Sequence, residues 1–203
     1  MVLLGKNLAA YRNEEILFKN LSFCLFPQQL MTITGPNGIG KSTLLRIIVG
    51  LLEAAEGQII FKDHEQRYPV ATACHYLGSQ NAMKPFLSVI NNLQFWAEFY
   101  GQHLRFVHET LADIGLSDLE HLPFNALSTG QQRRVAIARL LLSYRPLWIL
   151  DEPISGLDSH AQKLLSRIFQ RHLNQGGMII AATHYSLGIP ENHTIALEKF
   201  LPL

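Results

Sequence analysis

The sequence is poor in cysteine and almost neutral in charge, and each of these features excludes a class of protein. Its two cysteines, Cys24 and Cys74, lack the spacing of metal ligands, so we expect buried reduced thiols rather than a metal centre. The formal net charge of +1 provides no basic surface for a nucleic acid, which requires clustered positive charge. We therefore expect no nucleic-acid partner.

Membrane-spanning runs and export signals are also lacking. No apolar run of the sequence approaches the roughly 18 residues that cross a bilayer. The N-terminal residues do not lead from a basic start into a clean apolar stretch, so we expect no signal peptide. These features predict a cytoplasmic protein that works at a membrane only through a partner.

What the sequence does contain is typical of a folded domain, with 48% hydrophobic and 16% charged residues among 203. Apolar segments at 30–34, 147–151 and 178–183 are predicted to be buried strands. Segments 42–52 and 159–173 have the apolar spacing of helices. This alternation predicts an α/β fold with a mostly parallel sheet that is covered on both sides.

Two further regions complete the predicted single domain, residues 1–203. The β-favouring segments 14–26 and 57–62 predict an antiparallel β portion toward the N-terminus. Residues 81–145 are interpreted as a helical lobe that is inserted into an α/β core formed by residues 1–80 and 146–203.

The strongest motif is the string GPNGIGKST, which lies between the strand at 30–34 and the helix at 42–52. Its glycines allow backbone N–H groups to turn toward phosphates, and the helix N-terminus adds a positive dipole. We predict that Lys41 reaches the β- and γ-phosphates of ATP and that the Ser42 hydroxyl binds Mg²⁺. The predicted ATP-binding residues of this phosphate loop are Gly35, Pro36, Asn37, Gly38, Ile39, Gly40, Lys41, Ser42 and Thr43.

Two adjacent carboxylates, Asp151 and Glu152, stand at the end of the strand at 147–151. Alone, such a pair is usually a solvated strand end. Beside a phosphate loop, Asp151 is predicted to hold Mg²⁺ through water, and Glu152 is predicted to activate the attacking water as general base.

Two other predicted strands are followed by a polar side chain. Gln80 follows the strand at 73–78 and is predicted to contact Mg²⁺ or the attacking water. His184 follows the strand at 178–183 and is predicted to contact the γ-phosphate and hold the reacting geometry. Each is an ordinary surface residue if taken alone, so both predictions depend on the phosphate loop.

The segment LSTGQ precedes a helix that is predicted at 132–143. Ser128 is a natural N-cap, and capping is its simplest role. A helix N-terminus also binds anions, so this one can serve the γ-phosphate of a neighbouring molecule. The residues predicted to act in this way are Leu127, Ser128, Thr129, Gly130 and Gln131. Asp158 is either the cap of the next helix or a bridge between two nucleotide sites.

In this order, the motifs resemble those of the ATP-binding-cassette (ABC) ATPases along the whole chain. GPNGIGKST resembles the Walker A motif, LSTGQ the signature, WILDEP the Walker B motif and SGLD the D-loop, while Gln80 resembles the Q-loop glutamine and His184 the switch histidine. The resemblance implies an ATPase that uses Mg²⁺ and works as a pair of cassettes, here a homodimer. Each of two ATP molecules then lies between one Walker A loop and the other subunit's signature.

Two positions depart from the family pattern. Thr129 replaces the second residue of the usual LSGGQ signature and adds a side chain near the γ-phosphate. Tyr11 is the candidate for stacking on adenine, but it lies one position from the expected spacing, where Arg12 stands instead. A guanidinium can also stack on a base.

A narrower resemblance is to the cytochrome c biogenesis ATP-binding export proteins, the CcmA family, also called haem exporter protein A. The strings LGSQNAMKP, LSTGQQRRVAIARLLL, PLWILDEP and HLNQGGMIIAATH carry it. It implies a motor at the cytoplasmic face of the bacterial inner membrane, with CcmB- and CcmC-like permease subunits, for haem delivery to periplasmic c-type cytochromes. The aromatic-rich stretch 85–100, with Phe86 and Trp96, is the expected docking surface or else ordinary lobe core.

Two alternative functions stay open at this point. A motor for a drug, a lipid or a lipoprotein would carry the same motifs. A soluble ABC ATPase that acts on DNA or ribosomes is less favoured, because the chain has one cassette and lacks a heptad run or basic patch between Lys41 and Ser128.

Overall fold

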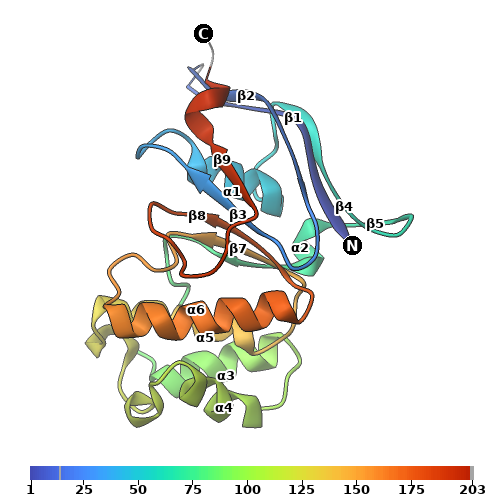
Figure 1. The fold of residues 1–203 in the computed structure, drawn as a ribbon. Coiled ribbons are helices and arrows are strands. Elements are labelled where there is room, and N and C mark those ends of the chain that lie inside the picture. The colour runs from blue at the N-terminus through green and yellow to red at the C-terminus, as the bar shows by residue number, and fades with distance from the viewer. Residues whose placement is uncertain (14, 202–203) are drawn as a thin grey trace.

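The computed structural model of the chain describes residues 1–13 and 15–201. Residue 14, which begins the predicted segment 14–26, and residues 202–203, which end the predicted domain, lie outside the described residues. Figure 1 shows two sheets and a group of helices that lies on one side of the parallel sheet.

The first sheet is antiparallel and has the order β2-β1-β4-β5. Its strands are β1 (Val2–Arg12), β2 (Glu15–Leu25), β4 (Glu56–Asp63) and β5 (Gln66–Tyr68). Sequence analysis did not predict β1 or β5. In β1 the register shifts between Gly5 and Leu8, and Asn7 has a φ of 49°. These irregularities interrupt the alternation by which a strand is recognised.

The second sheet is parallel throughout and has the order β6-β7-β8-β3-β9. Its strands are β6 (Cys74–Leu77), β7 (Leu147–Asp151), β8 (Met178–Ala182), β3 (Leu30–Thr34) and β9 (His193–Ala196). The bounds of β3 and β7 are those predicted from the sequence. The edge strand β9 was not predicted, because it is short and half exposed and gives little apolar signal.

Helix α1 (Lys41–Val49) packs between the two sheets. Leu44 and Ile48 of α1 share a buried cluster with Leu3 of β1 and with Ile149 of β7. The predicted helix at 42–52 was too long. It ends where Gly50 adopts a left-handed φ of 85°, and its N–H donates to the carbonyls of Arg46 and Ile47.

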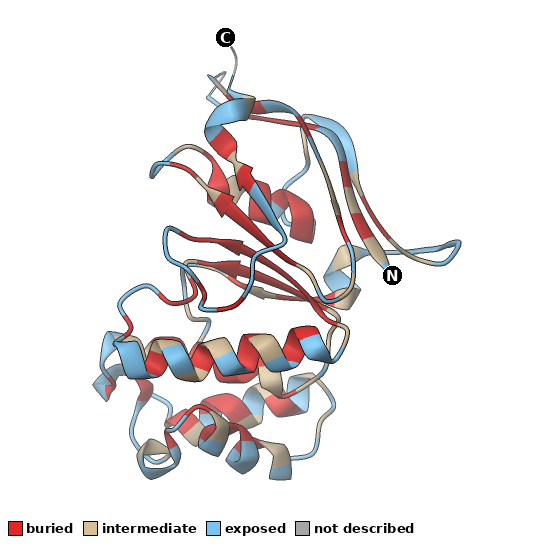
Figure 2. Cartoon of the chain, in the orientation of Figure 1, coloured by how far each residue is buried: buried red, intermediate tan, exposed pale blue. Residues whose placement is uncertain are grey.

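Four longer helices lie on the other side of the parallel sheet: α3 (Val89–Phe99), α4 (Arg105–Asp113), α5 (Thr129–Leu141) and α6 (Ser159–Asn174). Figure 1 shows α5 and α6 next to the sheet and α3 and α4 farther from it. Figure 2 shows the central parallel strands almost entirely buried, whereas α6 alternates between buried and exposed residues. Successive residues of β7 pack on opposite faces of the parallel sheet. Trp148 packs with these helices, and Ile149 packs with α1.

The remaining helices are short: α2 (Val70–Ala73), η1 (Ser117–Leu119) and η2 (Phe124–Ala126) lie in connections, and η3 (Leu197–Phe200) follows β9. The α/β fold class, with its parallel sheet, antiparallel portion and inserted helices, is confirmed. Within residues 1–13 and 15–201, no helix combines the length and apolarity needed to cross a bilayer.

The buried side chain of His75, in β6, makes the free energy of unfolding depend on pH. The side chain is 3% exposed, and its Nε2–H donates to the Ser143 carbonyl at 2.8 Å. Burial lowers the pKa of His75 from 6.5 to about 4. Between these two values the unfolded chain binds a proton that the folded chain does not, so stability falls as the pH falls through this window.

We predict that His75→Gln flattens this pH dependence, because glutamine can donate to the Ser143 carbonyl but does not titrate. Between pH 7 and pH 5 the free energy of unfolding of the unchanged protein should fall by about 2 kcal/mol more than that of the variant. Urea denaturation at the two pH values measures the difference. Equal losses in both proteins would contradict the role of His75.

Candidate functional site

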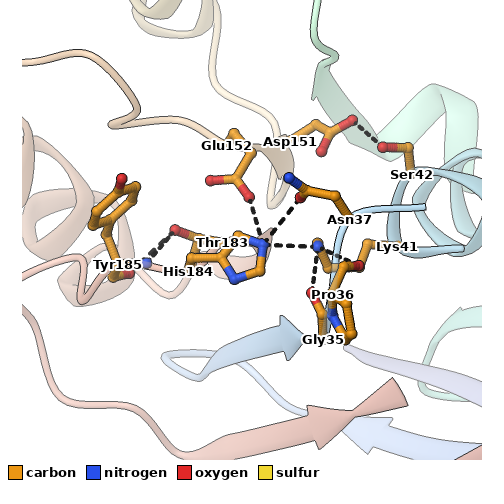
Figure 3. A network of polar contacts seen from close by, with 10 residues as sticks. All are labelled: Gly35, Pro36, Asn37, Lys41, Ser42, Asp151, Glu152, Thr183, His184 and Tyr185. Carbon is orange, nitrogen blue, oxygen red and sulfur yellow. Dashed lines mark hydrogen bonds and ion pairs between the residues drawn. The ribbon is translucent and has the colours of Figure 1, made fainter. Parts of the chain in front are cut away.

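Four parallel strands end at the same edge of the sheet, and the predicted site residues follow them. In the order β6-β7-β8-β3, these strands lead to Gln80, to the pair Asp151–Glu152, to His184 and to the phosphate loop at 35–43. Parallel neighbours present their carboxyl ends together, so segments that are distant in sequence meet there. Figure 3 shows the resulting polar network without Gln80.

The phosphate loop turns into α1 through left-handed backbone conformations. Gly38 and Gly40 have φ values of 85° and 115°, which glycine adopts at little cost. Gly40 is the N-cap of α1, and no described side chain caps that end of the helix. The first N–H groups of α1 thus form a positive helix terminus without a capping side chain, which leaves them free to donate to a phosphate.

Lys41 folds back over this loop and is only 7% exposed. Its Nζ donates to the Gly35 carbonyl at 2.5 Å and to the Pro36 carbonyl at 3.1 Å, and it lies 2.9 Å from Nε2 of His184. An ammonium has three N–H donors, and these three acceptors match them. The lysine charge is therefore held beside the loop by groups that follow β3 and β8.

Nε2 of His184 lies near one hydrogen-bond donor and two acceptors, and whether Nε2 carries the ring proton decides which of them it can bond. Because the Lys41 ammonium can only donate, Nε2 accepts from it when the imidazole is neutral with its proton on Nδ1. The same Nε2 lies 3.3 Å from Asn37 Oδ1 and 3.8 Å from Glu152 Oε1. A proton on Nε2 would favour these two oxygens over the lysine.

Ser42 and Asp151 join the start of α1 to the end of β7. The Ser42 hydroxyl donates to Asp151 Oδ2 at 2.7 Å, and Asp151 is 5% exposed. Hydroxyl and carboxylate oxygens are the ligands that Mg²⁺ takes beside substrate phosphates. The chemistry of these two side chains fits the predicted ion.

Glu152 has an unusual backbone and an unpaired carboxylate oxygen. Its φ is 46°, in the left-handed region, and its N–H donates to the Ala182 carbonyl at 2.8 Å. Its Oε2 is buried and has no hydrogen-bond partner among the described residues. Glu152 lines a cleft of about 140 Å³ together with Lys41, Ser42 and Asp151. The Glu152 side chain as a whole is 30% exposed, so its carboxylate is placed to take a proton from a water in this cleft.

The signature segment forms the capped first turn of α5. The Ser128 Oγ accepts from the Gln131 N–H at 3.3 Å, and the Gln131 side chain accepts from the Ser128 N–H at 2.8 Å. Helix α5 begins at Thr129, so the predicted start at 132 was wrong. The reciprocal cap brings Thr129 and Gly130, two weak helix formers, into the first turn.

The D-loop packs against the same turn. An added Cβ at Gly130 would lie 3.3 Å from Leu157 Cδ2, so a side chain there would require Leu157 to shift by a few tenths of an ångström. Asp158 is the N-cap of α6, since its Oδ1 accepts from the Ala161 N–H at 2.8 Å. That bond holds the pKa of Asp158 below its usual value. Capping is thus observed, and bridging between nucleotide sites stays a prediction.

Two candidates lie apart from the phosphate cleft. Gln80 is exposed and lines a different cavity, with Arg46 and Arg139. Tyr11 is 45% exposed on β1, whereas its neighbour Arg12 lines the cleft with the phosphate loop. The structure therefore favours Arg12 over Tyr11 as the residue of β1 beside a bound nucleotide.

Sequence analysis assigned no role to Arg133, which the structure places between the site segments. Its guanidinium contacts the loop after β6 and the end of β7. The signal was available in the spacing, because Arg133 shares a buried helical face with Ile137 and Leu140. A charged residue on such a face requires buried partners.

Comparison with known proteins adds the following findings. A family model described as ABC transporter matches residues 18–155. The cytochrome c biogenesis ATP-binding export protein CcmA of Bartonella quintana is 82% identical over 202 residues, which cover 100% of this chain and 97% of that protein. The protein of the same name from Mesorhizobium japonicum is 51% identical over 190 residues, with 93% and 94% covered.

Solved structures share the fold. A putative ABC transporter ATP-binding protein from Pyrococcus furiosus matches with a TM-score of 0.83 at 23% identity, and 100% of both chains is covered. The cbiO1 protein of Clostridium perfringens, part of the ABC transporter complex cbiONQ, matches with a TM-score of 0.74 at 27% identity, with 90% of this chain and 78% of that chain covered.

We predict that Glu152→Gln lowers the rate of ATP hydrolysis by about 10²- to 10⁴-fold, the usual contribution of a general base. The amide keeps the size of the side chain but cannot take a proton from water, so ATP binding should persist. Phosphate release and ATP binding measured on the same purified chain check both points. The matched control is Glu109→Gln, an exposed position on α4, and full turnover by Glu152→Gln would remove the base assignment.

Proposed function

The chain belongs to the ABC transporter family of ATP-binding proteins, and we propose that it is the ATP-hydrolysing motor of an export complex for c-type cytochrome biogenesis, with haem delivery as the process it serves. The convergence of Lys41, Ser42, Asp151 and Glu152 on one cleft carries the hydrolytic part of this proposal. The relatives named CcmA, which match nearly the whole chain, support the cytochrome part.

The phosphate loop binds the triphosphate. Lys41 and the first N–H groups of α1 contact the β- and γ-phosphates, and Arg12 lies against the base or ribose. Ser42 and Asp151 would hold Mg²⁺, and Gln80 would join them if its loop moved toward the cleft. When bound, the ion neutralises charge on the phosphate oxygens.

Glu152 then accepts a proton from the water that attacks the γ-phosphate. Its position in the phosphate cleft beside His184 supports this assignment. As the phosphates draw Lys41 toward them, Nε2 of His184 is released, and with its proton on Nε2 instead of Nδ1 the imidazole can donate to the γ-phosphate. Water, base and phosphate are thus aligned by side chains from β3, β7 and β8.

A second copy of the chain completes each site. Ser128 and Thr129 are exposed at the first turn of α5, and Asp158 lies beside them in a shared cavity. Within a single chain this positive helix end lines a different cavity from the phosphate cleft. We therefore assign it to the γ-phosphate held by the partner copy.

The helical lobe contacts the membrane partners, for which CcmB- and CcmC-like permeases are the candidates, at the cytoplasmic face of the inner membrane. Phe86 is 83% exposed and Phe99 is 68% exposed, which gives an apolar surface for a partner helix. Trp96 is half-buried, and its contacts favour the lobe-core alternative for this residue. It packs against the buried cluster, donates to the Ala82 carbonyl at 3.2 Å and lies under the Arg139 guanidinium.

We predict that Phe86→Asp weakens co-purification with the membrane subunits by at least tenfold, because a charge replaces an exposed aromatic anchor. ATP binding by the purified chain should stay unchanged, since Phe86 packs on no part of the site. The matched control is Phe26→Asp, a half-exposed aromatic at the end of β2. Loss of both co-purification and ATP binding would mean that Phe86 only supports the lobe.

The test of the whole proposal is made in the native host with Lys41→Ala in the chromosomal gene. We expect membranes to lose covalently bound haem, as seen by haem staining of denaturing gels, while b-type haem persists. Retained c-type haem with lost ATPase activity would remove the cytochrome role. A drug, lipid or lipoprotein exporter would then be the better description.

A further inference from the structure

Arg133 occupies the middle of the site without facing the cleft. It lies in the second turn of α5, is 6% exposed, and follows the signature by two residues. Its Nη1 donates to the Gly78 carbonyl at 2.9 Å and to Asn81 Oδ1 at 3.2 Å. One side of the guanidinium therefore holds both ends of the short loop that carries Gln80.

The other side of the guanidinium holds the end of β7. Its Nη2 donates to the Asp151 carbonyl and, at 3.2 Å, to the Glu152 carbonyl. These carbonyls bracket the residue whose φ is 46°. A non-glycine residue keeps such a conformation only where its surroundings determine it. Two bonds from one planar group to successive carbonyls are such a determinant.

We propose, on the basis of the function proposed above, that Arg133 is a positioning residue of the ATPase. It fixes the left-handed backbone of Glu152, and so the direction of its carboxylate, and it ties that backbone to the Gln80 loop and to the signature helix. A shift of α5 is thereby transmitted to the base and to the Gln80 loop of the same chain. Arg133 is not among the residues that line the phosphate cleft, so we expect it to act on turnover and not on binding.

The Arg133 guanidinium stays ionised in its buried position. Burial lowers the pKa of Arg133 to about 10, and the Asp151 and Glu152 carboxylates oppose that shift. At neutral pH the side chain remains a cation with all of its donors. Lysine at this position would keep the charge but lose the planar fork that reaches two segments at once.

The test is a double-mutant cycle with Arg133→Met and Glu152→Gln in the full chain. If Arg133 acts through Glu152, Arg133→Met lowers kcat by on the order of 10²-fold, the loss expected from a misplacement of about 1 Å. The ATP concentration for half-maximal rate should not change. In the Glu152→Gln background, followed by single-turnover hydrolysis of labelled ATP, Arg133→Met should cause no further loss.

Two further variants separate positioning from folding. Arg133→Lys should recover part of the lost kcat, and Asn81→Ala, which removes one acceptor, should cause a smaller loss of the same kind. The matched control is Arg145→Met, because Arg145 also donates to backbone carbonyls, those of Ala71 and Thr72, but outside the site. Its kcat should be that of the unchanged protein.

The proposal is overturned if Arg133→Met leaves kcat unchanged, if it acts on the half-saturating ATP concentration instead, or if it causes the same fold-loss in both backgrounds. If Arg133→Met does not fold, Arg133→Lys and Asn81→Ala test the proposal instead, by the same changes in kcat and in the half-saturating ATP concentration. A failure of the proposed ATPase mechanism itself would look different, because Glu152→Gln alone would then hydrolyse ATP at the full rate.

Discussion

The parallel pairing of β7, β8 and β3 is the constraint on which the site depends. Ala182 is in register with Asp151 on one side and with Ile33 on the other. This register brings Asp151, Glu152, His184 and the phosphate loop to one edge. The Ser42–Asp151 and Lys41–His184 contacts are only possible because the strands end in line. A slip of one residue would turn the side chains of a strand to the opposite face.

Much of this arrangement could be predicted from the sequence, and the reasons are physical. The strands at 30–34 and 147–151 are apolar runs buried on both faces, so composition and turns define their ends. The phosphate loop is recognisable because its chemistry requires glycines and a lysine at fixed spacing. By contrast, β1 was missed because its bulges break the alternation, and the start of α5 was misplaced because the cap absorbs Thr129 and Gly130.

Contacts that depend on tertiary structure could not be predicted in the same way. The short connection after β6 leaves Gln80 outside the phosphate cleft, and the β1–β2 hairpin turns Arg12 rather than Tyr11 toward it. The four-way contact of Arg133 needs the signature helix to lie across two strand ends. Each of these features follows from packing between segments that are far apart in the sequence, which local pattern does not encode.

In the proposed dimer, one chain supplies the phosphate loop and its partner supplies the signature, and mixed dimers test this division directly. Lys41→Ala disables the loop. Thr129→Asp places a carboxylate at an exposed first-turn position, which favours the helix but repels a phosphate. Neither homodimer should hydrolyse ATP, whereas co-expressed, doubly tagged dimers of the two variants have one complete site and should recover about half of the activity. An inactive mixed dimer, or a fully active Thr129→Asp homodimer, would contradict the account.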